Sequence, residues 1–460
     1  MKSAVVLAAG EGKGAWPYCG IRQKVTVPVV NVPMVRRLAL DLTAVGVTEI
    51  VVVVGHRGAA VRSCLAGLDG VRFVEQRALD GPVVAALLGV AEVEGEDVVV
   101  CSGDIVTTRD TLASLVEVYA ARKADAMLLT APCPEDVAHW MTVDADEHGL
   151  VREIFGHGKR RGTRFGGVAA AKKDLLERYL RRDPQLVENV GVGAMPRVEG
   201  DLASTFELMR RDGVEVHAVP AQGFLVDVDR PWHIALANQL AARDLCRSIE
   251  RTTIGEGASI HDGAEIADGA KVVLGPGARI GRGCRIEGAV VLGAGAELKN
   301  GAVIGGDAVL GDHARCEDYC SVGGCSVVGP DSIVSHCAEF DGVTFNRVFL
   351  YHYCCVTAVL GSNVDIGAAT VCGTLRFDNG VRGQVAKGHR EVPAACGHLT
   401  FIGDYSRTGV NAMFMPGVKV GYYSCVGAGA VVYEDVPERT LLLPKQEHII
   451  KEWGPEKYGW

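Results

Sequence analysis

A six-residue repeat governs the second half of the chain. Apolar residues recur at every sixth position in two runs, which are Ile254, Ile260, Ile266 and Val272, and then Leu274, Ile280, Ile286, Leu292, Leu298, Ile304 and Leu310. The repeat returns at 360–367 and 402–427, on either side of a break at 376–399. Hexapeptides of this kind build a parallel β-helix, in which the apolar residue points inward and three repeats complete a coil. We therefore predict a β-helix over 251–436 with an inserted loop at 376–399, followed by a tail over 437–460 that docks on the coil.

The first half alternates two kinds of segment. Largely apolar runs at 49–54 and 97–101 have the composition of strands buried on both faces, whereas 35–45 and 82–91 have helical spacing. This alternation is typical of a parallel sheet with helices on each side. We predict a Rossmann-like α/β domain over 1–232 with a mixed, mostly parallel sheet, and a connecting helix over 233–250. Ligands of such sheets bind at the carboxyl ends of the strands.

Length, charge and cysteine content narrow the functional classes. At 460 residues the chain is too long for one compact core, which agrees with two domains. A net charge of −9 argues against nucleic acid as a partner. No apolar run is long enough to span a membrane, and fifteen cysteines without a secretory signal indicate reduced thiols. We therefore expect a cytoplasmic protein with no membrane partner.

A glycine-rich loop follows the first strand. Residues 8–14 read Ala-Ala-Gly-Glu-Gly-Lys-Gly, directly after an apolar run that ends at Leu7. The backbone N–H groups of such a loop stay uncovered, so that a phosphate can approach them closely. Short glycine-rich loops are also common as tight turns, and the motif alone leaves both interpretations open. If the loop binds a nucleotide, the contacts come from Leu7, Ala8, Ala9, Gly10 and Gly12.

The residues after this loop carry a family resemblance. Five of them fall at the spacing of the sugar-phosphate nucleotidyltransferase family, namely Arg22, Lys24, Pro28, Asn31 and Pro33. The family opens with Leu-Ala-Ala-Gly-X-Gly-Thr-Arg, where this chain has Lys13-Gly14 in place of Thr-Arg. The resemblance implies that the arginine of the family, which is missing here, binds the triphosphate. Lys13 could supply the positive charge without the bidentate geometry of an arginine. The resemblance also implies a catalytic role for Lys24.

Two carboxylates are candidates for a metal site. Asp104 follows the apolar run at 97–101, and Asp227 lies in a segment that resembles the Asp-Val-Gly-Thr-Pro of the family. Two carboxylates together with phosphate oxygens suit Mg²⁺. The alternative for Asp104 is a cap on the next helix. The resemblance further implies that Gln76 reads the nucleotide base beside Gly81, although Pro82 stands where the family has Thr.

The residues expected at the sugar pocket depart from the family. Its Tyr-Gly is replaced by His139-Trp140, and its Asn-X-Gly by a segment that begins with Arg164 and ends with Gly166. A basic cluster that includes Lys159 and Arg164 could bind a sugar phosphate together with Gly166. A solvated surface loop is an equally good interpretation of the charges. The departures permit either an unusual sugar or a domain that has lost catalysis.

The combination of the two domains resembles bifunctional enzymes that join such a domain to a left-handed β-helix acetyltransferase. The resemblance implies a trimer, acetyl-CoA between neighbouring coils, and a catalytic histidine that maps onto His352 with a one-residue slip. A neutral histidine would take the proton from a sugar amine that attacks the thioester. A histidine among aromatic and cysteine neighbours can also be structural. In the inserted loop, Arg376 and Lys387 are candidates to bind acetyl-CoA, or to brace a trimer.

The sequence therefore predicts a homotrimeric transferase. It would make an NDP-sugar and pyrophosphate from an NTP and a sugar 1-phosphate with Mg²⁺, and the coil would add an acetyl-CoA-dependent acetyl transfer. The alternative is a catalytically impaired regulatory or scaffolding subunit that binds nucleotide sugars, because a fold alone does not fix an activity.

Overall fold

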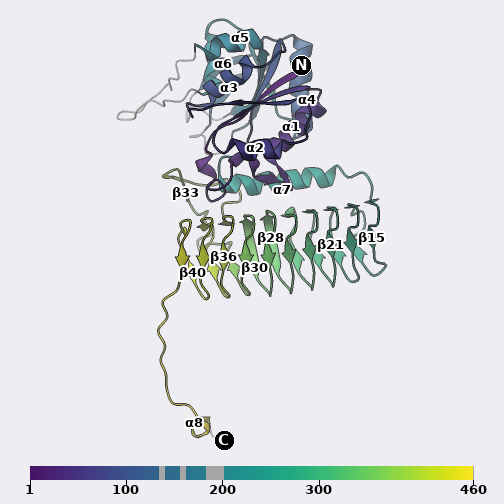
Figure 1. Ribbon diagram of the computed structural model, residues 1–460, viewed down its shortest axis with the longest axis vertical. Coiled ribbons are helices and arrows are strands. Elements are labelled where there is room, and N and C mark those ends of the chain that lie inside the picture. The colour runs from purple at the N-terminus through teal and green to yellow at the C-terminus, as the bar shows by residue number, and fades with distance from the viewer. Residues whose placement is uncertain (134–139, 156–161, 183–200, 459–460) are drawn as a thin grey trace.

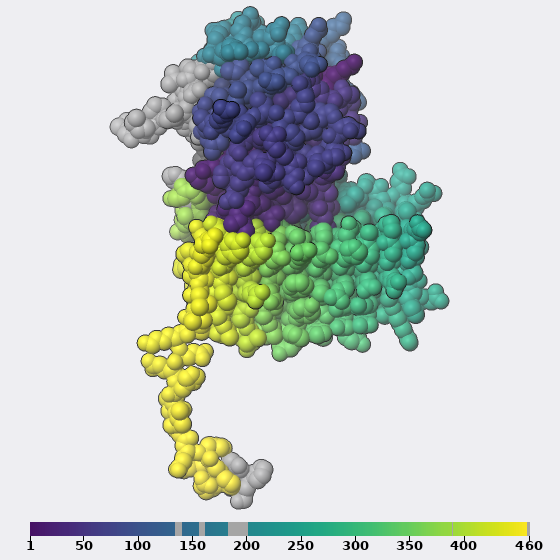
Figure 2. Space-filling model, viewed as in Figure 1, coloured from purple at the N-terminus to yellow at the C-terminus, as the bar shows by residue number. Residues whose placement is uncertain are grey.

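The computed structural model describes residues 1–133, 140–155, 162–182 and 201–458. Figure 1 shows an α/β domain beside a long coil of short strands, with helix α7 (Pro231–Arg247) lying between the two. In the space-filling view of Figure 2 the domain and the coil are in continuous contact. Within the described ranges, no helix combines the length and the apolar character that crossing a membrane requires.

The first domain is built on one mixed sheet of nine strands. Strand β1 (Ser3–Ala8) lies within it and pairs in parallel with β4 (Glu49–Val54) and β6 (Asp97–Ser102), while β4 also pairs with β5 (Val71–Glu75). These strands are apolar at nearly every position because helices cover both faces of the sheet. One face packs on α1 (Met34–Ala44), α2 (Gly58–Cys64) and α4 (Arg109–Arg122), and the other on α3 (Pro82–Ala91), α5 (Lys173–Leu180) and α6 (Leu202–Arg211).

Beyond β6 the sheet changes direction. Strand β11 (Thr163–Lys172) pairs antiparallel with β6, with β8 (Ala126–Pro132) and with β9 (Thr142–Ala145), and β10 (Val151–Phe155) pairs antiparallel with β9. Strand β12 (Val216–Pro220) returns to a parallel pairing with β8. The predicted mixed α/β fold is confirmed, with its parallel part formed by β1, β4, β5 and β6 and by the pair of β8 and β12.

A two-stranded ribbon brings the end of this domain back to the sheet edge. Strand β13 (Leu225–Asp227) pairs antiparallel with β7 (Ile105–Thr107), so that Asp227 lies opposite Ile105. The amide of Val228 donates a 3.1 Å hydrogen bond to the carbonyl oxygen of Asp104. The ribbon therefore places the carboxylates at 104 and 227 next to each other.

The second half is a parallel β-helix, as the hexapeptides predict. Its strands run from β14 (Thr253–Ile254) to β41 (Leu441–Leu442), and apart from a hairpin inserted at 384–391 they pair in parallel with strands of neighbouring coils. Ile286 pairs with Ile304, and both are 0% exposed because the repeat positions point into the coil. Cys316 takes the same inward place in a later coil, within one continuous apolar core. The periodicity thus fixes the side-chain direction along the whole coil.

Helix α7 joins the two parts through a shared apolar cluster. Outward-facing valines of successive coils, including Val309, Val327 and Val343, belong to the same cluster as Trp232 of α7. Because these outward positions are apolar, the coil offers the helix a continuous packing surface.

Two segments depart from the expectation for the coil. The break at 376–399 contains a hairpin of β33 (Gln384–Ala386) and β34 (His389–Glu391), which Figure 1 shows between the coil and the first domain. Beyond β41 the tail extends away from the coil, with Trp453 74% exposed, and ends in α8 (Pro455–Tyr458). Of the tail predicted over 437–460, Leu441 and Leu442 pair with the coil, but the prediction that the tail docks there is wrong for residues 443–453, which are exposed.

Candidate active site

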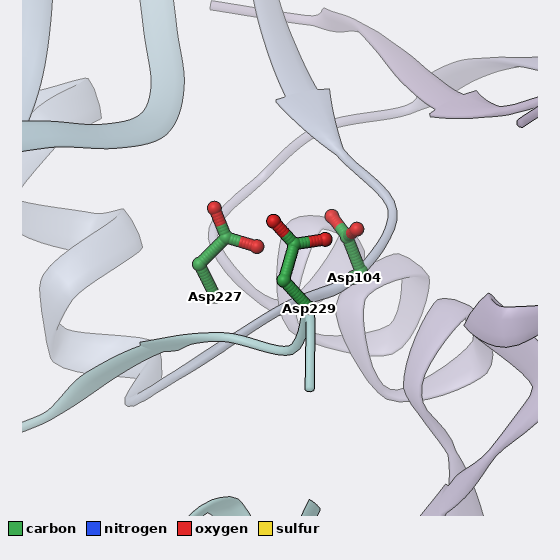
Figure 3. Close-up of side chains that lie close together, drawn as sticks. All are labelled: Asp104, Asp227 and Asp229. Atoms are coloured by element: carbon green, nitrogen blue, oxygen red, sulfur yellow. The ribbon is translucent and has the colours of Figure 1, made fainter. Parts of the chain in front are cut away.

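Three carboxylates meet at the edge of the central sheet, as Figure 3 shows. Asp104 follows the carboxyl end of β6, Asp227 ends β13, and Asp229 follows two residues later. One ligand oxygen from each lies within 4.8 Å of the others. The structure thus brings together the two carboxylates that the sequence proposes for a metal, and it adds Asp229 as a third.

Lys24 extends into this cluster from the short helix η2 (Lys24–Thr26). Its ammonium lies 2.5 Å from Oδ2 of Asp104 and 2.6 Å from Oδ1 of Asp229. Burial alone would lower the pKa of Lys24, but the charges of Asp104 and Asp229 outweigh it and raise the pKa above its ordinary value. Lys24 is therefore a permanent positive charge within the cluster.

The carboxyl groups are electrostatically unequal. The charge of Lys24 holds the pKa of Asp229 below its usual range, whereas burial and the charges of Asp229 and Asp104 raise the pKa of Asp227 well above it. His233 adds no positive charge, because burial lowers its pKa to about 4, and its Nδ1 accepts a 3.2 Å hydrogen bond from the Asp229 amide. An all-oxygen donor set with excess negative charge fits a hard divalent cation such as Mg²⁺.

The glycine loop borders the same cavity. Gly12 has a φ of 67°, and a Cβ at this position would lie 2.5 Å from Cβ of Lys24, so that only glycine fits. The side-chain amide of Gln23 donates hydrogen bonds to the carbonyl oxygens of Ala8, at 3.0 Å, and Gly10, at 2.9 Å. Gln23 stands where the resembled family has proline, and here it holds the loop through its side chain.

The residues proposed for nucleotide binding share one cavity with the acid cluster. Gln76 is buried, and its amide donates to Oδ1 of Asp80 at 2.6 Å and to the Gly81 carbonyl oxygen at 3.1 Å. Asp104, Asp229 and Lys24 line this cavity as well. The proposed nucleotide contacts that line it are Leu7, Ala8, Ala9, Gly10, Gly12, Gln76 and Gly81.

Lys13 and Gly14 lie at the end of the loop, in the short helix η1 (Lys13–Ala15). The ammonium of Lys13 is 2.5 Å from Oε2 of Glu11, and its side chain is 75% exposed. A Cβ on Gly14 would lie 3.1 Å from Cε of Lys387, which comes from the hairpin of the second domain. Lys13, which the sequence proposes as the substitute for the missing arginine, lines the cavity, and Lys387 lies against Gly14 in the same cavity.

Arg164 lies near the acid cluster on the side proposed for the sugar phosphate. Its guanidinium is buried, 4.2 Å from the centre of the Trp140 ring, and Nη2 donates a 3.3 Å hydrogen bond to the Leu225 carbonyl oxygen. Burial lowers the pKa of Arg164 although the charge of Asp227 opposes the shift. Its Nε is buried and has no hydrogen-bond partner among the described residues. A guanidinium with an unused donor at this place suits an anionic substrate group.

Of the other two residues proposed for the sugar phosphate, Gly166 is among the described residues and Lys159 is not. Gly166 packs against the strand that carries Asp227, since a Cβ there would lie 3.0 Å from Cδ1 of Leu225. Lys159 lies outside the described residues.

The residues proposed for acetyl transfer do not form one site within the chain. Nδ1 of His352 lies 2.9 Å from Nδ1 of His336, and Nε2 of His336 lies 3.2 Å from Oδ2 of Asp318. Arg376 lines a separate pocket on the inserted loop. Lys387, proposed from the sequence as an acetyl-CoA ligand, lies instead in the cavity of the first domain.

Sequence reasoning missed three residues of these sites. Asp229 had a signal, because carboxylates at i and i+2 of an extended segment point to the same side, and Asp227 is two residues away. His336 precedes its partner His352 by sixteen residues, which is close to one coil. No sequence signal points to Gln23, because its hydrogen bonds to the carbonyl oxygens of the loop form only in the folded chain.

Comparison with known proteins covers both halves of the chain. Residues 4–190 match the family model of the MobA-like NTP transferase domain, and residues 248–348 match that of the GMPPB C-terminal domain. The chain is 24% identical over 458 residues to the bifunctional protein GlmU of Methanococcus aeolicus, which covers 97% of this chain and 98% of that protein. It is also 24% identical over 462 residues to the protein of the same name from Methanococcus vannielii, with 98% and 99% covered.

A solved structure is similar to part of the chain. The inositol-1-phosphate CTP transferase from T. maritima has 20% sequence identity and a TM-score of 0.42, and the similarity covers 51% of this chain and 91% of that one. The two family matches and the full-length relatives support a sugar-phosphate nucleotidyltransferase domain fused to a C-terminal acyltransferase-like domain.

Proposed function

We propose that this chain transfers a nucleotidyl group from an NTP to a sugar 1-phosphate. An oxygen of the sugar phosphate bonds to the α-phosphorus of the NTP, the bond from that phosphorus to the β-phosphate oxygen breaks, and pyrophosphate leaves. The observation that carries the proposal is the contact of Lys24 with Asp104 and Asp229 at the edge of a glycine-lined cavity. No covalent enzyme intermediate is needed, since the site has only to position and neutralise phosphates.

Each group takes a role from its position. The backbone amides of the glycine loop bind phosphate oxygens, and Lys24 neutralises the charge that develops on the α-phosphate. Asp104, Asp227 and Asp229 would hold Mg²⁺, which when bound supplies positive charge shared with the phosphate oxygens. Arg164 would bind the sugar phosphate beside this cluster.

A direct assay tests the proposal. The purified chain is incubated with Mg²⁺, each of ATP, CTP, GTP, UTP and dTTP, and a panel of sugar 1-phosphates, and pyrophosphate release is followed. We expect release with at least one pair and its loss in EDTA. Release with no pair, while nucleotide still binds, would favour the alternative of a regulatory or scaffolding subunit that binds nucleotide sugars without turnover.

For the coil we propose an acetyl transfer from acetyl-CoA to a sugar amine. The supporting observation is the chain of contacts from Asp318 through His336 to His352. If His336 donates to Asp318 through Nε2, its Nδ1 accepts from Nδ1 of His352, and Nε2 of His352 becomes the basic atom. That atom would accept a proton from the amine as its nitrogen bonds to the acetyl carbonyl carbon. It would return the proton to the sulfur as the carbon–sulfur bond breaks and coenzyme A leaves as the thiol.

Three further expectations from the sequence stay predictions. They are the homotrimer, the left-handed sense of the coil, and the cytoplasmic location. Light scattering of the purified chain tests the first.

A further inference from the structure

The hairpin that interrupts the coil reaches the cavity of the first domain. Its turn carries Lys387, between β33 and β34, and Lys387 lines the cavity together with Gly14 and Asp229. We propose that Lys387 binds the polyphosphate of the nucleotide, as a residue that the β-helix domain contributes to the nucleotidyl-transfer site. The inference deepens the proposed function and rests on it.

The space beside Gly14 explains why a cation reaches this place from the second domain. A Cβ on Gly14 would lie 2.5 Å from the Asp229 carbonyl oxygen, 2.7 Å from Nη1 of Arg230 and 3.1 Å from Cε of Lys387. Contacts this short leave no room for a side chain at position 14. Position 14 itself therefore cannot carry a cation, and the stem of Lys387 lies beside it, in a cavity that Lys13 of the loop also lines.

The ammonium of Lys387 is available for a ligand. The side chain of Lys387 is exposed, and its charge contributes to the lowered pKa of Asp229, which lines the same cavity. The carboxylate of Asp229, which lines the same cavity, already pairs with Lys24 at 2.6 Å. An exposed lysine that borders uncovered loop amides, beside a carboxylate that already pairs with another lysine, suits a phosphate group.

Buried polar contacts hold the hairpin in place. Arg230 of the first domain donates from Nε and Nη2 to the two carboxylate oxygens of Glu391, both at 2.7 Å, and both residues are buried. On the coil side, the Gln384 amide donates to the carbonyl oxygens of Gly397 and Gly417, each at 2.9 Å. A bidentate pair fixes geometry as well as distance. The hairpin turn is thus positioned by both domains at once.

Binding of pyrophosphate with Mg²⁺ tests the inference, because this probe carries two phosphates and no base. By isothermal titration calorimetry, Lys387→Ala should raise the Kd of pyrophosphate about 10- to 100-fold, the loss expected for one charge-assisted hydrogen bond. Lys387→Arg should keep most of the affinity. A nucleoside monophosphate, which lacks the outer phosphates, should bind the wild type and Lys387→Ala equally.

Arg390→Ala is the matched control. Arg390 is an exposed cation on the same hairpin that lines a different pocket, so that its loss should leave pyrophosphate binding unchanged. Equal pyrophosphate affinity in the wild type and Lys387→Ala would overturn the inference, as would an equal loss in Arg390→Ala.

The same variants separate the inference from the proposed function. If the wild type releases pyrophosphate and Lys387→Ala keeps both kcat and the KM for NTP, the role of Lys387 is refuted and nucleotidyl transfer stands. If the chain binds pyrophosphate through Lys387 but turns over no sugar 1-phosphate, transfer is refuted and the phosphate-binding role of Lys387 is supported.

Discussion

The ammonium of Lys24 lies 2.5 Å from a carboxylate oxygen of Asp104, and this contact joins the segment after the glycine loop to the end of a central strand. Because Lys24 is buried, the attraction is little screened by water. The same contact is therefore expected to matter for the stability of the site and for its chemistry.

Replacement of Lys24 by methionine removes the charge and keeps most of the volume. We expect kcat for pyrophosphate release to fall about 10²- to 10³-fold, because the charge developing on the α-phosphate loses its fixed partner. The control is Lys172→Met, since Lys172 is an exposed lysine of the same domain that pairs with Asp125. A Lys24→Met enzyme with the kcat of the wild type would remove Lys24 from the mechanism.

Mg²⁺ should raise the thermal stability of the chain. The raised pKa of Asp227 reflects burial and the repulsion of Asp229 and Asp104, and a divalent cation relieves that repulsion. At about 100 times its Kd, an ion that binds only the folded state stabilises it by about 2.7 kcal/mol. Thermal unfolding with Mg²⁺ and with EDTA measures the difference.

Asp227→Asn should raise the unfolding temperature measured without Mg²⁺ and reduce the increase that Mg²⁺ causes. Without Mg²⁺ the variant should unfold at a higher temperature than the wild type, because one of three crowded carboxylates has lost its charge. The increment caused by Mg²⁺ should shrink. Asp262→Asn, at an exposed position of the coil, should behave as the wild type. If Mg²⁺ raises the unfolding temperature of Asp227→Asn as much as that of the wild type, the ion binds elsewhere.

The sequence predicts this molecule best where a period sets the direction of side chains. Ile286 and Ile304 point inward because the hexapeptide repeats, and the structure confirms both. The rule that ligands bind at the carboxyl ends of strands predicts the place of Asp104, and the family resemblance implies that Asp227 joins it. The helix expected at 82–91 has those bounds, since the Gly81-Pro82 pair marks its start.

The sequence contains no comparable signal for the contacts between the two domains. Arg22 falls at the spacing of a nucleotidyltransferase motif, yet its Nη2 lies 2.8 Å from Oδ1 of Asp404 on the coil. The strands of the inserted hairpin have three residues each, too few for alternation to show. From the sequence alone, Lys387 is therefore assigned to a binding site of the β-helix domain that carries it. In the folded chain it lines the cavity of the first domain.

His352→Ala should abolish most of any acetyl transfer by the coil. Loss of a general base typically costs about 10²- to 10⁴-fold, measured here as acetyl-CoA consumption with amino-sugar acceptors. His336→Ala should cost less, because His336 only orients its neighbour through the 2.9 Å contact. His313 is also exposed and has the same φ of 58° on the coil, so that His313→Ala is the control. If acetyl-CoA consumption is unchanged in His352→Ala, His352 is not the general base.

Glu391→Ala should release the hairpin from the first domain. It leaves the Arg230 guanidinium buried without its bidentate partner, and breaking a buried pair in this way costs about 3–5 kcal/mol. We expect hydrogen exchange to quicken at the amides of 384–391 and the KM for NTP to rise, while the coil interior around Ile304 keeps its protection. Replacing both partners by methionine should slow the exchange again, since no charge is then stranded. Unchanged exchange in Glu391→Ala would mean that the Gln384 hydrogen bonds alone hold the hairpin.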